Sequence, residues 1–229
     1  MRIGVLSDVH GNNVALAAAL AALGDVDAFM FLGDLAGYYP FVRECLDLWP
    51  KQRMWAVRGN HDQVLLDCLD ADTRPSAEYL RQCGSGLERA MLALPRDAYD
   101  TIRGWPLQNT PRIDGAVFLL CHGAPWDPLE ARVYPDALPW KRLREVRADY
   151  LLMGHTHYPF VARVGEKTVV NPGSVGQARN ESGVAFCALL DTGSGGAQIV
   201  SARYSPDVLV ADARSHDPAI PYLVEVLTR

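Results

Sequence analysis

The stretch RIGVLSDVHGNN, residues 2–13, decides the fold of this 229-residue chain. Residues 3–7 form a short apolar run with β-branched members, which is typical of a buried strand. Two potential metal ligands, Asp8 and His10, follow directly. The glycine and asparagines after them permit a tight turn and a helix cap, and apolar spacing near the helical period predicts a helix over residues 14–23. A strand, a polar turn and a helix are the parts of an open α/β site, where ligands bind outside the strand ends.

The same arrangement recurs along the chain. A single Asp-x-His pair after a strand is more often an ordinary turn than a metal site, so the recurrence gives the pattern its weight. Predicted strands over residues 28–32, 54–57, 116–121 and 150–153 are each followed at once by side chains that bind metals. These turns contain Gly33-Asp34, Gly59-Asn60-His61-Asp62, His122-Gly123 and Gly154-His155-Thr156-His157.

The positions of the histidines point the same way. Five of the six histidines lie just after predicted strands, whereas histidines that only fill a core would be scattered over strand and helix interiors. The carboxyl ends of parallel strands converge on one edge of a sheet, so these side chains can meet there. Imidazole, carboxylate and amide ligands suit Mn²⁺, Fe, Zn²⁺ or Ni²⁺. Seven ligands are too many for one tetrahedral zinc and suit two ions that share a carboxylate. They are Asp8, His10, Asp34, Asn60, His122, His155 and His157.

The length and the remaining elements predict a single α/β domain over residues 1–229. Residues 70–105 read as helices without ligand clusters, which indicates a packing or cover layer. An Asp114-Gly115 pair predicts the turn of a β-hairpin. Strands near residues 184–190 and 198–204 are expected to complete a second sheet, and the residues after 205 to be helical.

Composition limits the classes of partner. The net charge of −5 argues against a general nucleic-acid surface, which would be basic. The five cysteines are widely spaced and form no Cys-x-x-Cys, so reduced thiols in a cytoplasmic protein are expected rather than a disulfide framework. The first residues already form a strand, and no apolar run could span a bilayer. We therefore expect neither a signal peptide nor a membrane partner, and the oligomeric state stays open.

In order and in strand context, five motifs of this chain resemble those of the calcineurin-like metallophosphoesterase superfamily. They are Asp8-x-His10, Gly33-Asp34, Gly59-Asn60-His61-Asp62, His122 and Gly154-His155-x-His157. The short chain and its Asn171-Pro172-Gly173-Ser174 segment resemble the small bacterial and archaeal phosphodiesterase branch, to which a eukaryotic retromer subunit is related. The resemblance covers residues 1–176. It implies a four-layer α-β-β-α sandwich, with two mixed sheets face to face and helices outside.

The resemblance also implies roles for the site residues. One ion would be held by Asp8, His10, Asp34 and His157, and the other by Asp34, Asn60, His122 and His155, so that Asp34 bridges. Two such cations can lower the pKa of a bound water toward about 7, and the resulting hydroxide attacks phosphorus. His61 matches the family's proton donor to the leaving group, with Asp62 as a residue that could orient it. The alternative is that His61 only fixes Asn60.

The implied activity is hydrolysis of phosphodiester or phosphomonoester bonds in a small phosphate ester such as a nucleotide. Diesters are slightly preferred over monoesters as the expected substrates. Protein phosphatases of this superfamily follow the second Asp with a pattern ending Asp-Arg-Gly, whereas here Asp34 is followed by Leu-Ala-Gly-Tyr-Tyr. Protein phosphatase activity is therefore not expected. Arg58 and Arg132 are candidate substrate contacts, although Arg58 could instead pair with Asp62.

A metal-binding scaffold of the same fold, as in the retromer subunit, is the other interpretation. A scaffold tends to lose metal ligands, whereas here all seven ligand positions are filled. Catalysis is therefore expected, and a scaffold role stays open beside it.

Overall fold

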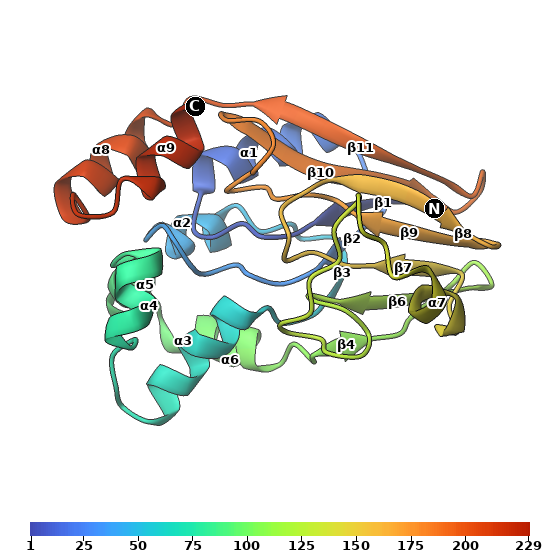
Figure 1. Cartoon of the computed structure of the whole chain (residues 1–229), viewed down its shortest axis with the longest axis horizontal. Helices are drawn as coiled ribbons and strands as arrows, with labels where there is room; N and C mark the ends of the chain where they lie inside the picture. The colour runs from blue at the N-terminus through green and yellow to red at the C-terminus, as the bar shows by residue number, and fades with distance from the viewer.

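Two mixed β-sheets lie face to face in the computed structural model, which describes residues 1–229 (Figure 1). The first sheet has the strand order β11-β10-β1-β2-β3. Its strands are β1 (Arg2–Leu6), β2 (Ala28–Phe31), β3 (Arg53–Ala56), β10 (Val184–Asp191) and β11 (Gly196–Arg203). Strands β1, β2 and β3 are parallel, so their carboxyl ends, and the turns that follow them, meet at one edge.

The second sheet has the order β4-β6-β7-β9-β8, and β5 pairs with β6. Its strands are β4 (Gln108–Asn109), β5 (Arg112–Ile113), β6 (Ala116–Cys121), β7 (Tyr150–Leu152), β8 (Phe160–Val164) and β9 (Lys167–Asn171). The predicted Asp114-Gly115 turn joins β5 to β6, and both of its residues have positive φ. Strands β6 and β7 are parallel, so His122 and the turn containing His155 also emerge side by side.

The structure corrects one expectation about the sheets. Strands β10 and β11 do not complete the second sheet but extend the first, where β10 pairs antiparallel with β1 from Arg2↔Asp191 to Val5↔Ala188. Strand β10 is apolar on both faces: Ala188 and Leu190 pack between the sheets, whereas Cys187 packs toward the helices. Such a strand fits a central position, and local sequence does not say beside which partner it lies.

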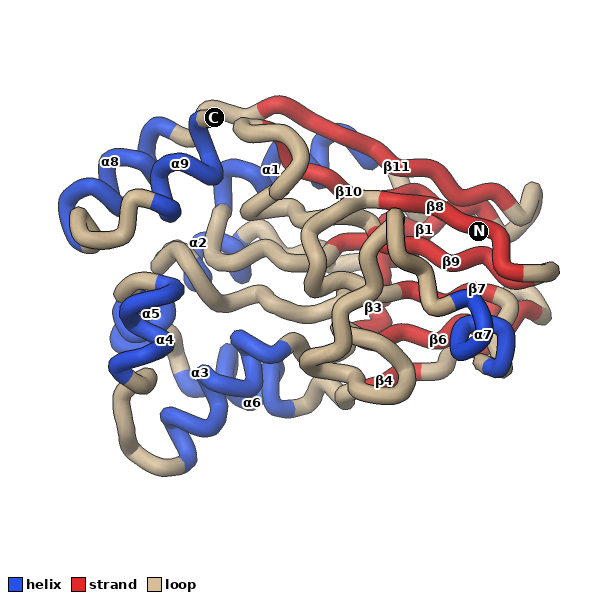
Figure 2. The backbone as a smooth tube through the Cα atoms, viewed as in Figure 1, coloured by secondary structure: helices blue, strands red, loops and turns tan.

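Helices cover the outer face of the first sheet and extend beyond the strand ends (Figure 2). They are α1 (Asn13–Leu23), α2 (Val42–Asp47), α3 (Asn60–Asp70), α4 (Ala77–Cys83), α5 (Gly86–Ala93), α6 (Arg96–Arg103), α8 (Asp207–His216) and α9 (Tyr222–Thr228). The outer face of the second sheet carries only α7 (Trp140–Glu145) and the loop before it. The four-layer α-β-β-α order is therefore confirmed, with a thin fourth layer. No helix of the chain is both long enough and apolar enough to cross a bilayer.

Hydrogen bonds at two helix starts confirm or refine the predicted caps. The Asn12 side chain accepts a hydrogen bond from the N–H of Ala15 and caps α1. Helix α3 begins at Asn60, and the Asp62 carboxylate accepts the N–H of Gly59, which is the one half of a capping box that a glycine at the N-cap allows. Asn60 and the two residues after it therefore project from the first turn of a helix.

The cover segment and the C-terminal helices hold each other in place. Arg89 of α5 donates two hydrogen bonds of 2.7 Å to the Asp212 carboxylate of α8. The N–H and the hydroxyl of Ser85 both donate to Asp217. These bonds fix α4, α5, α8 and α9 as one wall beyond the strand ends, the helical groups on the left of Figure 2.

Candidate metal centre

The backbone at five of the predicted ligands lies in the left-handed region. Asp8, His10, Asp34, His155 and His157 have φ between 51° and 65°, a conformation that costs a non-glycine residue of order 1 kcal/mol or more. The other two non-glycine residues with positive φ lie in ordinary turns. This backbone strain lies in the turns after β1, β2 and β7. Its concentration there indicates that the surrounding structure holds these side chains in fixed orientations for a functional reason.

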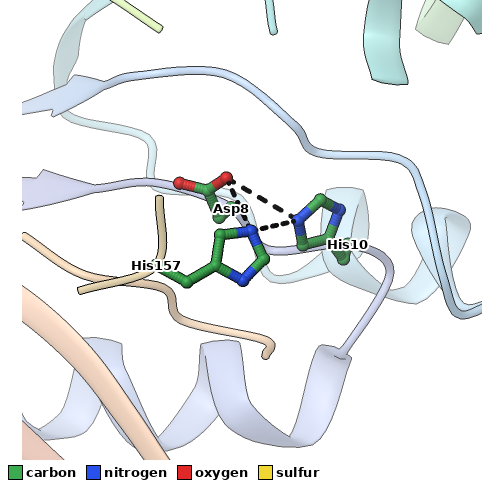
Figure 3. Close-up of side chains that lie close together, drawn as sticks. All are labelled: Asp8, His10 and His157. Carbon is green, nitrogen blue, oxygen red and sulfur yellow. Dashed lines mark hydrogen bonds and ion pairs between the residues drawn. The ribbon is translucent and has the colours of Figure 1, made fainter. Parts of the chain in front are cut away.

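Asp8, His10 and His157 form the first group of ligand side chains, and all three are buried (Figure 3). The Nε2 atoms of the two histidines lie 3.1 Å apart, and Asp8 Oδ1 lies 3.1 Å from Nε2 of His157. Asp8 Oδ2 accepts hydrogen bonds from the Ser7 hydroxyl and the His155 N–H. The other oxygen, Oδ1, is buried without a hydrogen-bond partner.

The second group lies around His122, at the end of β6. Its Nε2 atom lies 3.0 Å from Asn60 Oδ1 and 3.1 Å from Nδ1 of His155. The Asn60 oxygen comes from the first turn of α3, so three separate turns supply this group.

Asp34 lies between the two groups and belongs to both. Its Oδ2 atom lies 3.2 Å from Nε2 of His122 and 3.9 Å from Nε2 of His10. Its Oδ1 atom accepts the backbone N–H of His61 at 2.8 Å, which fixes the carboxylate plane. This is the position that a bridging carboxylate needs.

The hydrogen bonds around these rings leave lone pairs facing each other. The Nδ1 atoms of His10, His122 and His157 donate to the backbone carbonyls of Ala36, Leu32 and Gln177, respectively. In the neutral rings, Nε2 therefore carries a lone pair. Two such atoms at 3.1 Å, with the unpartnered Asp8 Oδ1 beside them, form no hydrogen bond among themselves. A cation is the partner that satisfies all three, so the residues present fit a metal site.

The charges of the site point to the same use. Burial raises the pKa of Asp8 and Asp34, but neighbouring imidazoles outweigh it and hold both pKa values below the usual range. Burial lowers the pKa of His155 to about 4. Burial also lowers the pKa of His122, but the two carboxylates raise it to about 10. The carboxylates are thus ionised at neutral pH, and His122 keeps a proton that a bound cation would displace.

His61 faces the site from α3, and a residue of the cover segment holds it. The hydroxyl of Tyr79, in α4, lies 2.6 Å from Nδ1 of His61. No other protein group accepts a hydrogen bond from this hydroxyl, so Tyr79 is assigned as the donor, which leaves the proton of the neutral ring on Nε2. Burial lowers the pKa of His61 to about 3, so the ring is neutral at pH 7 before substrate binds.

The structure gives Asp62 a different contact from the predicted one. Its carboxylate accepts the backbone N–H groups of Asp34, Ala36 and Gly59, and forms no hydrogen bond with the His61 ring. Asp62 therefore fixes the turn that carries Asp34. It does not orient His61, because its side chain points to the turn after β2.

The two predicted substrate arginines lie in different surroundings. Arg132 donates from Nε to Nε2 of His155 at 3.2 Å, beside the second group of ligands. Arg58 forms no ion pair with Asp62, and its Nε atom is buried without a hydrogen-bond partner. Only Arg132 is thus shown in contact with a ligand side chain.

Several residues of the site carry no signal in a local motif. Tyr79 lies in a segment that reads as a plain amphipathic cover. Gln177 accepts the His157 ring proton through its backbone carbonyl, which any residue could supply. The Asn171-Pro172-Gly173-Ser174 segment did signal its importance: Asn171 donates to the carbonyl of Gly154, and Ser174 donates to the carbonyl of Asp8.

Known proteins share both the sequence pattern and the architecture. A calcineurin-like phosphoesterase superfamily domain matches residues 1–195. An uncharacterized protein of Methanocaldococcus jannaschii is 26% identical over an alignment of 225 positions, which spans 88% of this chain and 87% of that protein. The structure of a metallophosphoesterase from Sphaerobacter thermophilus is 26% identical, with a TM-score of 0.78 and coverage of 100% of this chain and 98% of that one. A hypothetical protein from Pyrococcus horikoshii, 20% identical, has the same fold with a TM-score of 0.79 over 99% of this chain and 97% of its own. With its ordered motifs, its two facing sheets and its paired ligand groups, the chain belongs to the calcineurin-like phosphoesterase superfamily.

Proposed function

We propose that this protein is a dinuclear metal-dependent phosphoesterase that hydrolyses phosphodiester bonds, phosphomonoester bonds or both. The observation that carries the proposal is the position of Asp34. One of its oxygens lies within 3.9 Å of the Nε2 atoms of His10 and of His122, which belong to separate ligand groups. A single carboxylate shared by two sets of nitrogen and oxygen donors is the arrangement that two adjacent cations require.

The ligand assignment follows from the two groups. Asp8, His10, His157 and Asp34 would hold one ion, and Asp34, Asn60, His122 and His155 the other. Nitrogen and oxygen donors without thiolates suit Mn²⁺, Fe, Zn²⁺ or Ni²⁺, and Mn²⁺ is the ion that we propose first. When bound, two divalent ions supply the Lewis acidity that activates water near neutral pH and neutralises phosphoryl oxygens.

His61 is proposed to act on the leaving group. Tyr79 holds the ring so that its Nε2 proton is free to be donated. Burial keeps this ring neutral in the free protein, and the negative charge of a bound phosphate ester opposes that shift. The neutral ring can then donate an Nε2–H hydrogen bond to the departing oxygen, and once the bound phosphate has let it take up a second proton, the imidazolium can transfer a proton to that oxygen. Asp62 supports this indirectly, through the turn that holds Asp34.

A metal-binding scaffold without physiological catalysis is the alternative of a different class. The filled set of seven donors and the strained backbone beneath five of them speak for catalysis, because a surface used only for protein contacts needs neither. The substrate proposed is a small phosphate ester, such as a nucleotide, and diesters are placed ahead of monoesters.

The test is a screen of the purified protein with added Mn²⁺ against bis-p-nitrophenyl phosphate, p-nitrophenyl phosphate and a nucleotide panel. We expect metal-dependent release of product, with His61→Asn losing about 10²–10⁴-fold in kcat on a nucleotide diester and much less on a nitrophenyl ester. Metal content should be unchanged in that variant. Absence of turnover with any divalent ion, in protein that has bound the ions, would favour the scaffold.

A further inference from the structure

Arg179, near the metal centre, has no carboxylate partner, and its Nε atom, like that of Arg58, is buried without a hydrogen-bond partner. Elsewhere in the chain, Arg89 and Arg103 form bidentate pairs with carboxylates. A partly desolvated guanidinium without an anion costs stability. An anion from outside the chain is therefore the natural partner of Arg179.

The backbone holds Arg179 on the His157 side of the centre. It lies in the loop between β9 and β10, which is fastened to the first group of ligands at two points. The Ser174 hydroxyl donates to the backbone carbonyl of Asp8 at 2.8 Å. Two residues before Arg179, the carbonyl of Gln177 accepts the proton of His157 Nδ1 at 2.6 Å. The position of this arginine is thus tied to the ligands themselves.

Two half-buried tyrosines connect this arginine to the centre. Tyr222, in α9, contacts the Arg179 side chain and donates a hydrogen bond of 3.3 Å to the Gln177 side chain. The Tyr38 ring lies 6.3 Å from the Tyr222 ring and 4.8 Å from the ring of His10. The Tyr38 hydroxyl is a phenol O–H and can donate a hydrogen bond to an anion. The Arg179 guanidinium and the Tyr38 phenol thus lie near the first group of ligands, and Tyr222 contacts Arg179 and holds the Gln177 side chain.

Arg132 provides positive charge on the opposite side. It lies against His155 of the second group, whereas Arg179 lies beyond His157 of the first. Two cations and Arg132 are enough to neutralise one phosphoryl group, which carries at most two negative charges near neutral pH. The charge of Arg179 is then left for another anion.

We propose that Arg179, together with the hydroxyl of Tyr38, binds a second phosphoryl group of the substrate that is not itself hydrolysed. This inference rests on the proposed phosphoesterase function and narrows its substrate class. The substrate is a phosphate ester that carries a further phosphate, such as a nucleoside phosphorylated on both its 3′ and 5′ oxygens.

The experiment compares ligands that differ by one phosphate. Calorimetry with the Mn²⁺-loaded protein measures the affinities of thymidine 3′,5′-bisphosphate and thymidine 5′-monophosphate. In parallel, kcat/KM is measured for the 5′-p-nitrophenyl ester of thymidine 5′-phosphate with and without a 3′-phosphate. A charged hydrogen-bonded contact contributes about 10- to 100-fold in affinity. We expect the wild-type protein to favour the second phosphate by that factor in both measurements.

The variants decide which residue is responsible. Arg179→Met should lose most of the preference for the second phosphate, and Arg179→Lys should keep part of it, because charge remains but the planar fork is lost. Arg103→Met, which removes an exposed arginine of α6, is the control and should keep the preference. Metal content is measured in each variant.

Each outcome has one meaning. A wild-type protein without preference, or a preference that survives in Arg179→Met, overturns the inference. Equal losses on both ligands also overturn it, because Arg179 would then serve the scissile phosphate or the fold. Binding that prefers the bisphosphate through Arg179, in a protein that hydrolyses no ester, would support the anion subsite and refute the proposed function.

Discussion

Replacing Tyr79 by phenylalanine removes one oxygen atom and, with it, the hydrogen bond that holds the His61 ring. The hydroxyl donates to Nδ1 of His61 at 2.6 Å, and this bond leaves the ring proton on Nε2. In Tyr79→Phe the ring keeps its place in α3 but loses the partner that selects its rotation and its tautomer. The perturbation therefore tests how His61 works without touching a metal ligand.

The size of the effect follows from the bond. Loss of a hydrogen bond that leaves a buried partner unsatisfied costs about 1–3 kcal/mol. For a chain of this size, each 1 kcal/mol lowers Tm by about 2–4 °C. If losing this hydrogen bond raises the activation free energy by about 1.4–2.7 kcal/mol, the rate falls about 10- to 100-fold. That loss is smaller than the one expected for His61→Asn, since the imidazole remains.

The assay compares two esters that differ in their need for a proton. An alkyl or ribose alkoxide is a poor leaving group, whereas p-nitrophenolate departs easily without protonation. We expect Tyr79→Phe to lower kcat about 10- to 100-fold on a nucleotide diester and less than about 3-fold on a nitrophenyl ester. The control is Tyr99→Phe, which removes a 2.6 Å bond to the Met91 carbonyl in the same cover segment. It should lower Tm similarly without dependence on the leaving group.

Two results would refute the reasoning. Equal losses on both esters would mean that Tyr79 shapes the whole site rather than His61. A fall in Tm with unchanged kinetics, as expected for the control, would mean that the bond only stabilises the fold.

The shared carboxylate of Asp34 predicts about two divalent ions per chain by elemental analysis. Asp34→Asn should impair both sites and Cys187→Ser neither, and saturation at one ion would contradict the dinuclear assignment. Chelation should lower Tm because bound metal no longer stabilises the folded state. At a metal concentration a hundredfold above Kd, that stabilisation is about 2.7 kcal/mol of unfolding free energy per site. Circular dichroism should still show the secondary structure, because the three main core clusters contain no metal ligand; complete unfolding would refute this. In the metal-free chain, burial lowers the pKa of His122 but two carboxylates raise it from 6.5 to about 10. The stability that protonated His122 contributes is complete below its pKa in the unfolded chain, 6.5, and is lost as the pH rises through its pKa in the folded chain, about 10. With chelator present, Tm should therefore fall between pH 6.5 and about pH 10. Mn²⁺ should abolish the fall, and a flat profile without metal would count against the assignment.

Local sequence was enough to predict which ligand-type side chains come close together at the candidate site. Each strand that ends in a ligand is short and apolar, and its polar turn follows at once, so the periodicity located Asp8, Asp34 and His122 at strand ends. The parallel pairing of β1 with β2 then brings Asp8 and Asp34 to one edge, whereas the facing of the two sheets brings His122, after β6, beside them. The left-handed backbone beneath five of the ligands could not be read in advance, since aspartate and histidine give no such sign by themselves.

The sequence alone determined the parts of this protein that depend on neighbours in the chain: the strand-turn-helix units, the candidate ligand residues that follow the strands and the family to which the motifs belong. Only the tertiary structure decided which strand β10 pairs with, where Asp62 points, and that Tyr79 and Arg179 stand beside the centre. The reason is physical. Periodicity and caps depend on residues a few positions apart, whereas a contact such as that between His61 and Tyr79, 18 residues apart, depends on how whole helices pack against the sheet edge.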